Sequence, residues 1–311
     1  MNKNHPQPIQ FRSLSEAMRV MGYPPPQHPL IAIINGIDNE VKAPPPQFRH
    51  RLCFYKISYR VHIGGLLPYG GTKFDFLEGG LFFAAPTQVI GQDHAEPDND
   101  PGCLTGQLTL LIHPDFFIHY PIAQNIKNYN YFSYTVNEAL LLSEQEKNTI
   151  LTLFREIEHE LNNRIDDFSQ DIVISQLELL LNYAQRYYKR QFITRSQVNH
   201  YIIKKINQLL SDYFDDAQSL HSGLPSVQYL SNELNLSPGY LSDMLRSISG
   251  LSAQQHIHEV LLEKAKEKLL STEQSVSEIA YELGFEHPQS FSKFFKSKTL
   301  QSLLSFRGSF N

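Results

Sequence analysis

Near the C-terminal end of the chain lies a short stretch of basic and aromatic residues that could bind phosphate groups. It reads HPQSFSKFFKSK at residues 287–298, with Lys293, Lys296 and Lys298 among three phenylalanines and without a carboxylate. The whole chain is acidic, with 27 Lys and Arg against 32 Asp and Glu. Lysines on a helix can donate to phosphates or to base edges in a major groove. We therefore interpret the phenylalanines as the face that holds a helix to its domain and the lysines as a face for DNA.

The elements that would position these lysines occur twice in the last third of the chain. Residues 227–236 align with residues 276–285 at an offset of 49. Each copy has the pattern of a short amphipathic helix, a tight turn and a second short helix. One such pattern is weak evidence for DNA binding, but two in register are much more specific. The sequence therefore predicts two helix-turn-helix units, at about 226–248 and 275–298.

The second helix of each unit has one apolar face and one polar face. Ser237 followed by Pro238 is typical of a helix start, and with one extra residue in the turn Arg246 aligns with Lys296. We expect the polar side to contact DNA through Gly239, Tyr240, Ser242, Asp243, Arg246, Gln289, Ser290, Ser292, Lys293 and Lys296.

Asp243 is the unusual member of this set, because it places a carboxylate on a face that would meet phosphates. It lies three residues before Arg246, the one cation of its helix. It could hold the guanidinium in position, accept a hydrogen bond from cytosine, or simply repel DNA. We favour repulsion, because an unpaired carboxylate near phosphates is costly.

A longer helix is predicted between the two units. Residues 252–270 lack Pro and Gly and have apolar residues spaced by four, namely Ile257, Leu261, Ala265 and Leu269. A helix of this length spans about 28 Å at 1.5 Å per residue. Successive major grooves on one face of DNA lie about 34 Å apart, so such a helix could hold both second helices near that separation.

The first half of the chain has the alternation of β-strands. From Cys53 to Ile63 every second residue is apolar, while Lys56, Ser58, Arg60 and His62 alternate with them and are predicted to face solvent. Short strands separated by Gly and Pro turns favour a barrel or sandwich.

Two tyrosines of this strand, Tyr55 and Tyr59, fall on its buried face. They could line a pocket for a small-molecule effector, or they could fill the core of a small barrel.

A helical pattern begins at Ser143, which forms a capping box with Glu146. A second helix is predicted from about Asp171 to Arg190 and is apolar on more than one side. A second copy of the protein could cover its outer side, or the helix could pack only on its own barrel.

The C-terminal part resembles the DNA-binding domain of the AraC/XylS family of bacterial transcription regulators, over about Val198 to Arg307. The stretches LSPGYLSDMLRSISGLS, LLEKAKEKLL and SVSEIAYELGFEHPQSFSKFFKSK carry the likeness. It implies that Pro238–Ile248 and Pro288–Ser297 are recognition helices. Upstream, FDFLEGGLFFAAP and LLIHPDFF resemble segments of the cupin-like sensor barrels of this family.

The chain departs from the family pattern in two places. The family usually has a basic residue where Asp243 stands. Leu300 and Leu303 replace the glycine and proline of the turn that follows the second recognition helix. The C-terminal region also has slightly more carboxylates than cations, so we expect few phosphate contacts per chain.

These observations predict an α+β chain with a cupin-like β-barrel sensor domain at 1–142, a helical segment for dimerisation at 143–195 and an all-α double helix-turn-helix domain at 198–311. The expected function is a DNA-binding transcription regulator. Its expected partners are double-stranded promoter DNA, RNA polymerase where it activates, a second copy of the chain and a small-molecule effector.

The alternatives are a metal enzyme built on a cupin-type barrel and a ligand-binding module with an added helical domain. A barrel metal site needs two or three histidines and a carboxylate that converge. His62 falls on the solvent-facing side of its strand, His94 lies in a turn-rich loop, and His113 and His119 flank a Phe pair. His256 and His258 have no third ligand near them in the sequence. We expect no catalytic residue, metal or cofactor.

The remaining features favour a cytoplasmic protein. No window has the roughly 18 consecutive apolar residues of a membrane helix, and residues 1–18 do not have the pattern of a signal peptide. Cys53 and Cys103 form no metal-ligand spacing and no disulfide framework.

Overall fold

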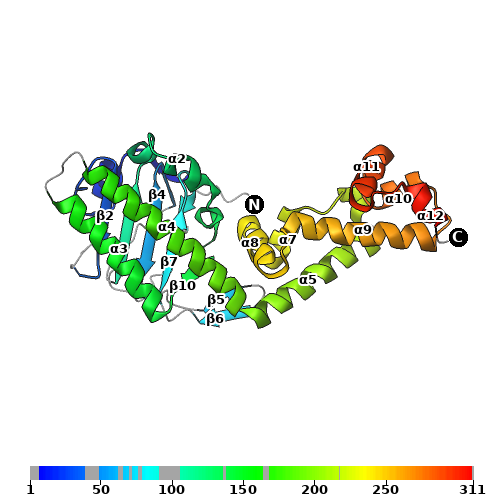
Figure 1. Cartoon of the computed structure of the whole chain (residues 1–311). Coiled ribbons are helices and arrows are strands. Elements are labelled where there is room, and N and C mark those ends of the chain that lie inside the picture. The colour runs from blue at the N-terminus through cyan, green and yellow to red at the C-terminus, as the bar shows by residue number, and fades with distance from the viewer. Residues whose placement is uncertain are drawn as a thin grey trace. The chain divides into compact units, whose positions relative to one another are not determined.

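The structure is a computed structural model that describes residues 7–38, 49–61, 66–69, 72–75, 79–90, 106–135, 138–163, 168–216 and 218–309. The chain divides into two compact units, Met1–Gln191 and Phe192–Asn311 (Figure 1). In these ranges no helix combines the length and the apolar content needed to cross a bilayer.

The described strands of the N-terminal unit form three sheets. The largest has the order β10 (Leu140–Leu141), β7 (Gly80–Ala84), β4 (Tyr55–Arg60), β9 (Gln107–Ile112) and β2 (Ile31–Asn35), with every pair antiparallel. A second contains β1 (Ile9–Phe11), β3 (His50–Leu52) and β8 (Val89–Ile90), and a third β5 (Leu66–Tyr69) and β6 (Thr72–Asp75). The predicted α+β class is confirmed, while closure of these strands into a barrel stays a prediction.

The helices of this unit are α1 (Leu14–Val20), α2 (Ile122–Asn125), α3 (Glu144–Asn162) and α4 (Ser169–Thr194), with short 3-10 helices at Pro114–Phe117, Ile126–Asn128 and Asn130–Ser133. The predicted capping box at the start of α3 is confirmed: Ser143 accepts from the N–H of Glu146, whose carboxylate accepts from the N–H of Ser143. α3 and α4 lie across one face of the five-stranded sheet (Figure 1). Lys147 of α3 lies next to Tyr59, and Tyr188 of α4 packs against Phe83.

The opposite face of the five-stranded sheet is buried too, which corrects the prediction for Ser58. This residue was expected to face solvent but is 2% exposed. Its hydroxyl shares a hydrogen bond with the Thr109 hydroxyl and accepts one from the Gln107 amide at 2.7 Å. On the same face, apolar residues of α1 pack against Ala32 and Ile34 of β2. Arg60, on the same side of β4, is exposed as predicted. Alternation therefore fails at Ser58, where the sheet is covered on both sides.

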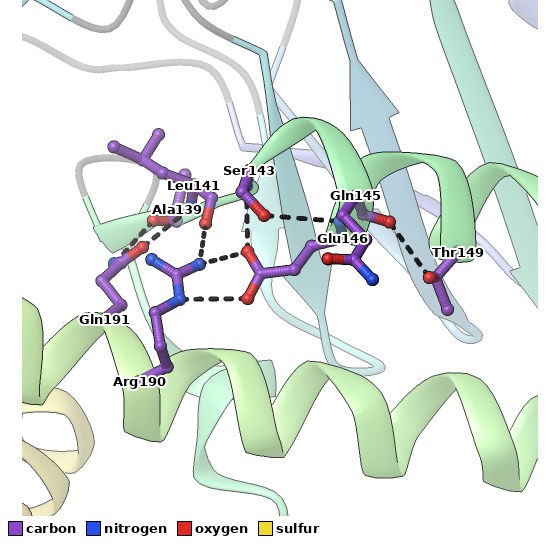
Figure 2. A network of polar contacts seen from close by, with 8 residues as sticks. All are labelled: Ala139, Leu141, Ser143, Gln145, Glu146, Thr149, Arg190 and Gln191. Carbon is purple, nitrogen blue, oxygen red and sulfur yellow. Dashed lines mark hydrogen bonds and ion pairs between the residues drawn. The ribbon is translucent and has the colours of Figure 1, made fainter.

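The last full turn of α4 in the N-terminal unit holds the edge strand β10 (Figure 2). Arg190 donates to the Leu141 carbonyl at 2.8 Å and, through two nitrogens, to the Glu146 carboxylate. Gln191 accepts from the Leu141 N–H at 2.8 Å and donates to the Ala139 carbonyl at 3.2 Å. These side chains satisfy strand groups that a further strand would otherwise bind, so they close this edge of the sheet.

The C-terminal unit is helical. Its helices are α5 (Ser196–Asp215), α6 (Gln218–Ser222), α7 (Val227–Leu234), α8 (Pro238–Ser249), α9 (Ala253–Ser271), α10 (Val276–Glu282), α11 (Pro288–Thr299) and α12 (Leu303–Gly308). Both predicted helix-turn-helix pairs are present, as α7 with α8 and α10 with α11. The predicted 19-residue connecting helix is α9. In Figure 1, α8 lies near one end of α9, and α10, α11 and α12 lie near the other.

The two helix-turn-helix turns begin with the same backbone geometry. Asn235 and Gly284, 49 positions apart, both adopt positive φ, at 54° and 93°. In each turn the N–H of the following residue bonds the carbonyl five positions earlier, Leu236 to Ser231 at 3.0 Å and Phe285 to Ala280 at 2.9 Å. This pattern ends a helix with a left-handed residue and supports the duplication inferred from the sequence.

Gly284 is further constrained by close packing. A Cβ at this position would lie 2.6 Å from the carbonyl carbon of Gly223 and 2.7 Å from its oxygen. The backbone before α7 therefore packs directly against the second turn. Only a residue without a side chain fits this contact.

We expect Gly284→Ala to lower the free energy of unfolding of the C-terminal unit by more than about 2 kcal/mol. The left-handed conformation alone costs a residue with a Cβ about 1 kcal/mol, and displacement of the Gly223 backbone adds to this. Gly250→Ala is the matched control, since Gly250 has φ +79° and the described part of the chain places no atom within 4 Å of an added methyl group. Urea unfolding followed by circular dichroism measures both; equal losses would contradict the packing argument.

Candidate nucleic-acid interface

The first candidate surface is the outer side of α8. Ser237 caps the helix by accepting from the Tyr240 N–H at 3.2 Å, and Pro238 occupies the first turn, as predicted. Leu241, Met244 and Leu245 are buried. Arg246 is exposed, and the predicted contact residues Gly239, Ser242 and Asp243 are half-buried. The structure therefore brings four of the five predicted α8 residues to one accessible side.

Tyr240 is the exception, and its predicted place on the exposed face is wrong. The side chain is completely buried, and its ring packs edge-on against Phe192, with centroids 5.0 Å apart. Tyr240 therefore packs α8 against Phe192 within the C-terminal unit. Ile248, an apolar residue near the C-terminal end of α8, is 37% exposed. The buried side of α8 is thus shifted toward its N-terminal turn.

The second candidate surface is the outer side of α11. Phe291 and Phe295 are fully buried and Phe294 is half-buried, in a cluster with residues of α9 and α10. Exposed along the other side are all five predicted residues, Gln289, Ser290, Ser292, Lys293 and Lys296. The phenylalanines of the sequence therefore anchor the helix, and the lysines extend from it.

The cations on the two helices differ in their partners. Nη1 of Arg246 lies 3.4 Å from Oδ1 of Asp243. Nζ of Lys298 lies 3.5 Å from Oε1 of Glu259 on α9. For Lys293 and Lys296 no ion pair is found among the residues that the structure describes. Sequence reasoning missed Glu259, because a pair that joins two helices 39 positions apart leaves no local pattern.

Both candidate helices end with a left-handed residue. Gly250 closes α8 with φ 79° and Leu300 closes α11 with φ 61°, and their N–H groups bond the carbonyls of Arg246 and Lys296. The turn after α11 thus keeps the geometry of its counterpart, although leucine stands where the resembled family has glycine. The offset between the two helix ends is 50, which agrees with one extra residue in the second turn.

The predicted effector residues lie in the other unit. Tyr55 and Tyr59 are buried, at 8% and 1% exposure, which confirms their predicted face. Tyr55 packs against Phe117 and Phe132, and burial raises the pKa of both tyrosines above the ordinary value. Both tyrosines therefore lie on the side of the five-stranded sheet that α3 and α4 cover, and both are neutral phenols.

The histidines considered as metal ligands are separated in the structure. His256 shares a hydrogen bond with Asn207 and His258 with Gln254, each at 2.9 Å, and burial lowers the pKa of both rings. Across the described ranges, no three His, Cys, Asp or Glu side chains converge on one point. His62 and His94 lie outside those ranges.

A family model described as a helix-turn-helix domain matches residues 230–309. This range starts within α7 and includes α8, α9, α10 and α11, together with all of α12. Both candidate surfaces therefore fall inside the matched region.

Curated relatives share part of the chain. Histidine kinase P4 from Formosa agariphila is 27% identical over 106 residues, which cover 34% of this chain and 7% of the kinase. An uncharacterized HTH-type transcriptional regulator from Staphylococcus aureus is 29% identical over 140 residues, covering 45% of this chain and 17% of the regulator. The chain thus spans less than a fifth of the length of either relative.

Solved structures of similar domains also exist. The C-terminal domain of the two-component response regulator yesN from Fusobacterium nucleatum is 32% identical, with 33% of this chain and 95% of that chain covered and a TM-score of 0.30. The C-terminal domain of AraT, a response regulator from Geobacillus stearothermophilus, is 31% identical, with coverages of 35% and 84% and a TM-score of 0.31.

We expect Leu300→Gly to raise the free energy of unfolding of the C-terminal unit by about 0.5–1 kcal/mol. Relief of the left-handed strain at a β-carbon outweighs the larger unfolded-state entropy of glycine. The leucine side chain is 86% exposed, so little packing is lost. Thermal and urea unfolding check this against Leu300→Ala, which keeps the strain and should gain nothing. A loss of stability with glycine would show that the leucine makes a needed contact.

Proposed function

We propose that this chain, whose C-terminal part is an AraC-type helix-turn-helix domain, is a sequence-specific DNA-binding regulator of transcription. The observation that carries the proposal is the pair of equivalent helix-turn-helix units, each with one buried and one accessible side on its second helix. One accessible side carries Arg246 and the other Lys293 and Lys296. Where the protein activates transcription, RNA polymerase is a further partner.

In this proposal α8 and α11 enter successive major grooves on one side of the duplex. The 19 residues of α9 extend about 28 Å, close to the roughly 34 Å between such grooves. If α9 were longer or shorter by several turns, α11 would lie over the phosphate backbone and not in a major groove. Residues Gly239, Ser242, Asp243 and Arg246 of the first helix, and Gln289, Ser290, Ser292, Lys293 and Lys296 of the second, are the proposed contacts.

For the N-terminal unit we propose the sensor role, with a cupin-like barrel within residues 1–142 that binds a small-molecule effector. Tyr55 and Tyr59 are the proposed effector contacts. Tyr59 lies beside Lys147 of α3, so a ligand that displaced this ring would also displace α3. Through the Arg190–Glu146 contact, the position of α3 affects the end of α4 (Figure 2).

For the predicted dimer we propose the outer side of α4 as the contact with a second copy. Ile172 and Leu179 are 43% and 46% exposed and lie seven residues apart, which places them on the same side of the helix two turns apart. Two such helices packed against each other would remove both side chains from water.

DNA binding is tested first with the lysines of α11. We expect Lys293→Ala or Lys296→Ala to weaken binding to the specific duplex by about 1 kcal/mol. A lysine that contacts phosphate should also reduce the salt slope by about one unit, whereas one that reads a base should lose affinity at one position of the site. Lys266→Ala is the control, because that lysine lies on α9 and pairs with Glu263 at 2.7 Å. Unchanged binding after the double substitution would leave both lysines as solvated charges.

The dimer is tested by sedimentation of the full chain at micromolar concentration. The double change Ile172→Glu and Leu179→Glu should convert a dimer to a monomer, because it would place carboxylates in an apolar contact. Val20→Glu is the control, since Val20 is 50% exposed and lies on α1. A monomeric wild-type chain, or a dimer that survives the double change, would exclude α4 as the contact.

A further inference from the structure

The second helices of the two units carry different charges at corresponding positions. With the offset of 50 set by their left-handed end residues, Asp243 and Arg246 of α8 correspond to Lys293 and Lys296 of α11. The pair on α8 has no net charge, whereas the pair on α11 carries two positive charges. Two helices that are alike in backbone therefore present unlike electrostatics to a bound duplex.

The geometry of the α8 pair indicates how Asp243 acts. Its side chain is 23% exposed and that of Arg246 is 59% exposed, so the carboxylate lies near the helix surface and the guanidinium extends beyond it. The contact uses Nη1 of the arginine, at 3.4 Å. In the described part of the chain, Nε and Nη2 make no hydrogen bond. With this Nε–Nη2 edge of its guanidinium, an arginine can donate two parallel hydrogen bonds to O6 and N7 of guanine.

The Asp243 carboxylate also changes how tightly α8 binds DNA that lacks the specific base sequence. It offsets the attraction of Arg246 to phosphates, which is the part of DNA binding that does not depend on sequence. Hydrogen bonds to a base edge need a match in position and are less affected. An exposed ion pair of this kind adds little to folding stability, so its main effect falls on binding.

The lysines of α11 have the opposite properties. A lysine is a compact point charge on a flexible stem and binds phosphate without the fixed two-donor geometry of arginine. With no ion pair among the described residues, Lys293 and Lys296 can attract phosphates of any sequence.

We infer, as a deepening of the proposed function, that the two recognition helices, α8 and α11, have different roles in DNA binding. α8 reads guanine through Arg246, with Asp243 as the positioning residue that aims the guanidinium and suppresses binding to other sequences. α11 supplies most of the phosphate attraction. Asp243 is thus a determinant of specificity, although it contacts Arg246 rather than DNA.

The test uses the full chain and two duplexes, one selected in vitro for tight binding to the wild type and one with the same bases scrambled. With Asp243→Ala, binding to the scrambled duplex should tighten about fivefold, and the ratio of specific to scrambled affinity should fall about tenfold. Asp243→Asn keeps an acceptor for Nη1 without the charge, so it should also tighten scrambled binding but keep most of the ratio. Lys293→Ala is the matched control and should weaken both duplexes equally.

A second measurement changes the DNA and leaves the protein intact. Replacing each guanine of the selected duplex in turn by 7-deazaguanine removes the N7 acceptor. At one guanine the wild type should lose affinity about tenfold, and Arg246→Ala and Asp243→Ala should lose much less there. This readout does not depend on comparing the stability of variants.

The outcomes separate the inference from the function on which it rests. If Asp243→Ala tightens both duplexes equally, Asp243 only repels DNA and the positioning role is wrong. If no 7-deazaguanine substitution distinguishes the wild type from Arg246→Ala, guanine is not read by α8. A wild-type chain for which selection yields no preferred duplex would contradict the proposed function itself.

Discussion

The burial of one face of α9 fixes the positions of both candidate reading helices. Its buried residues are Ala253, Ile257, Leu261, Leu262, Ala265 and Leu269. Along this face α9 contacts α5, α7, α8, α10 and α12, and its residues share a core with Phe291 and Phe295 of α11. The helix has no Pro or Gly, and a capping box of Ser252 and Gln255 starts it. Because one uninterrupted helix packs against both helix-turn-helix pairs, the distance between the two pairs is set by helix geometry rather than by a flexible linker.

The two helix-turn-helix pairs that α9 joins share backbone features but differ in their side chains. Asn235 and Gly284 supply the same left-handed turn, and Gly250 and Leu300 supply the same helix end. Of these four positions, only Gly284 requires glycine, because a Cβ there would clash with the Gly223 backbone. Asn235 and Leu300 adopt positive φ with a side chain, and at Gly250 no described atom lies within 4 Å of an added Cβ. Backbone geometry therefore constrains few residues here. The surface positions between those residues are left for contacts that differ between the two helices.

Local patterns predicted the C-terminal helices well, because caps and apolar spacing act over a few residues. α8 begins at the predicted Pro238, and α9 differs from its predicted range by one residue at each end. The failures involve partners distant in the chain. Tyr240 is buried because Phe192 covers it, and Ser58 is buried because Thr109 and Gln107 lie beside it in the sheet. No periodicity within a helix or strand reports such contacts, so side-chain exposure was predicted less well than element type.

Ion pairing explains how a C-terminal unit with more carboxylates than cations can present a positive surface. The three lysines of α9 are each held by a carboxylate, Lys264 by Asp215, Lys266 by Glu263 and Lys268 by Glu282. Lys264 lowers the pKa of the Asp215 carboxyl, and Asp215 in turn raises the pKa of Lys264, so both stay charged near neutral pH. A phosphate that drew one of these lysines away would leave its carboxylate unpaired, which reduces the gain. For Lys293 and Lys296, the described residues supply no such competitor. The net charge of the unit therefore says little about its affinity for DNA, which depends on the cations that no neighbouring carboxylate holds.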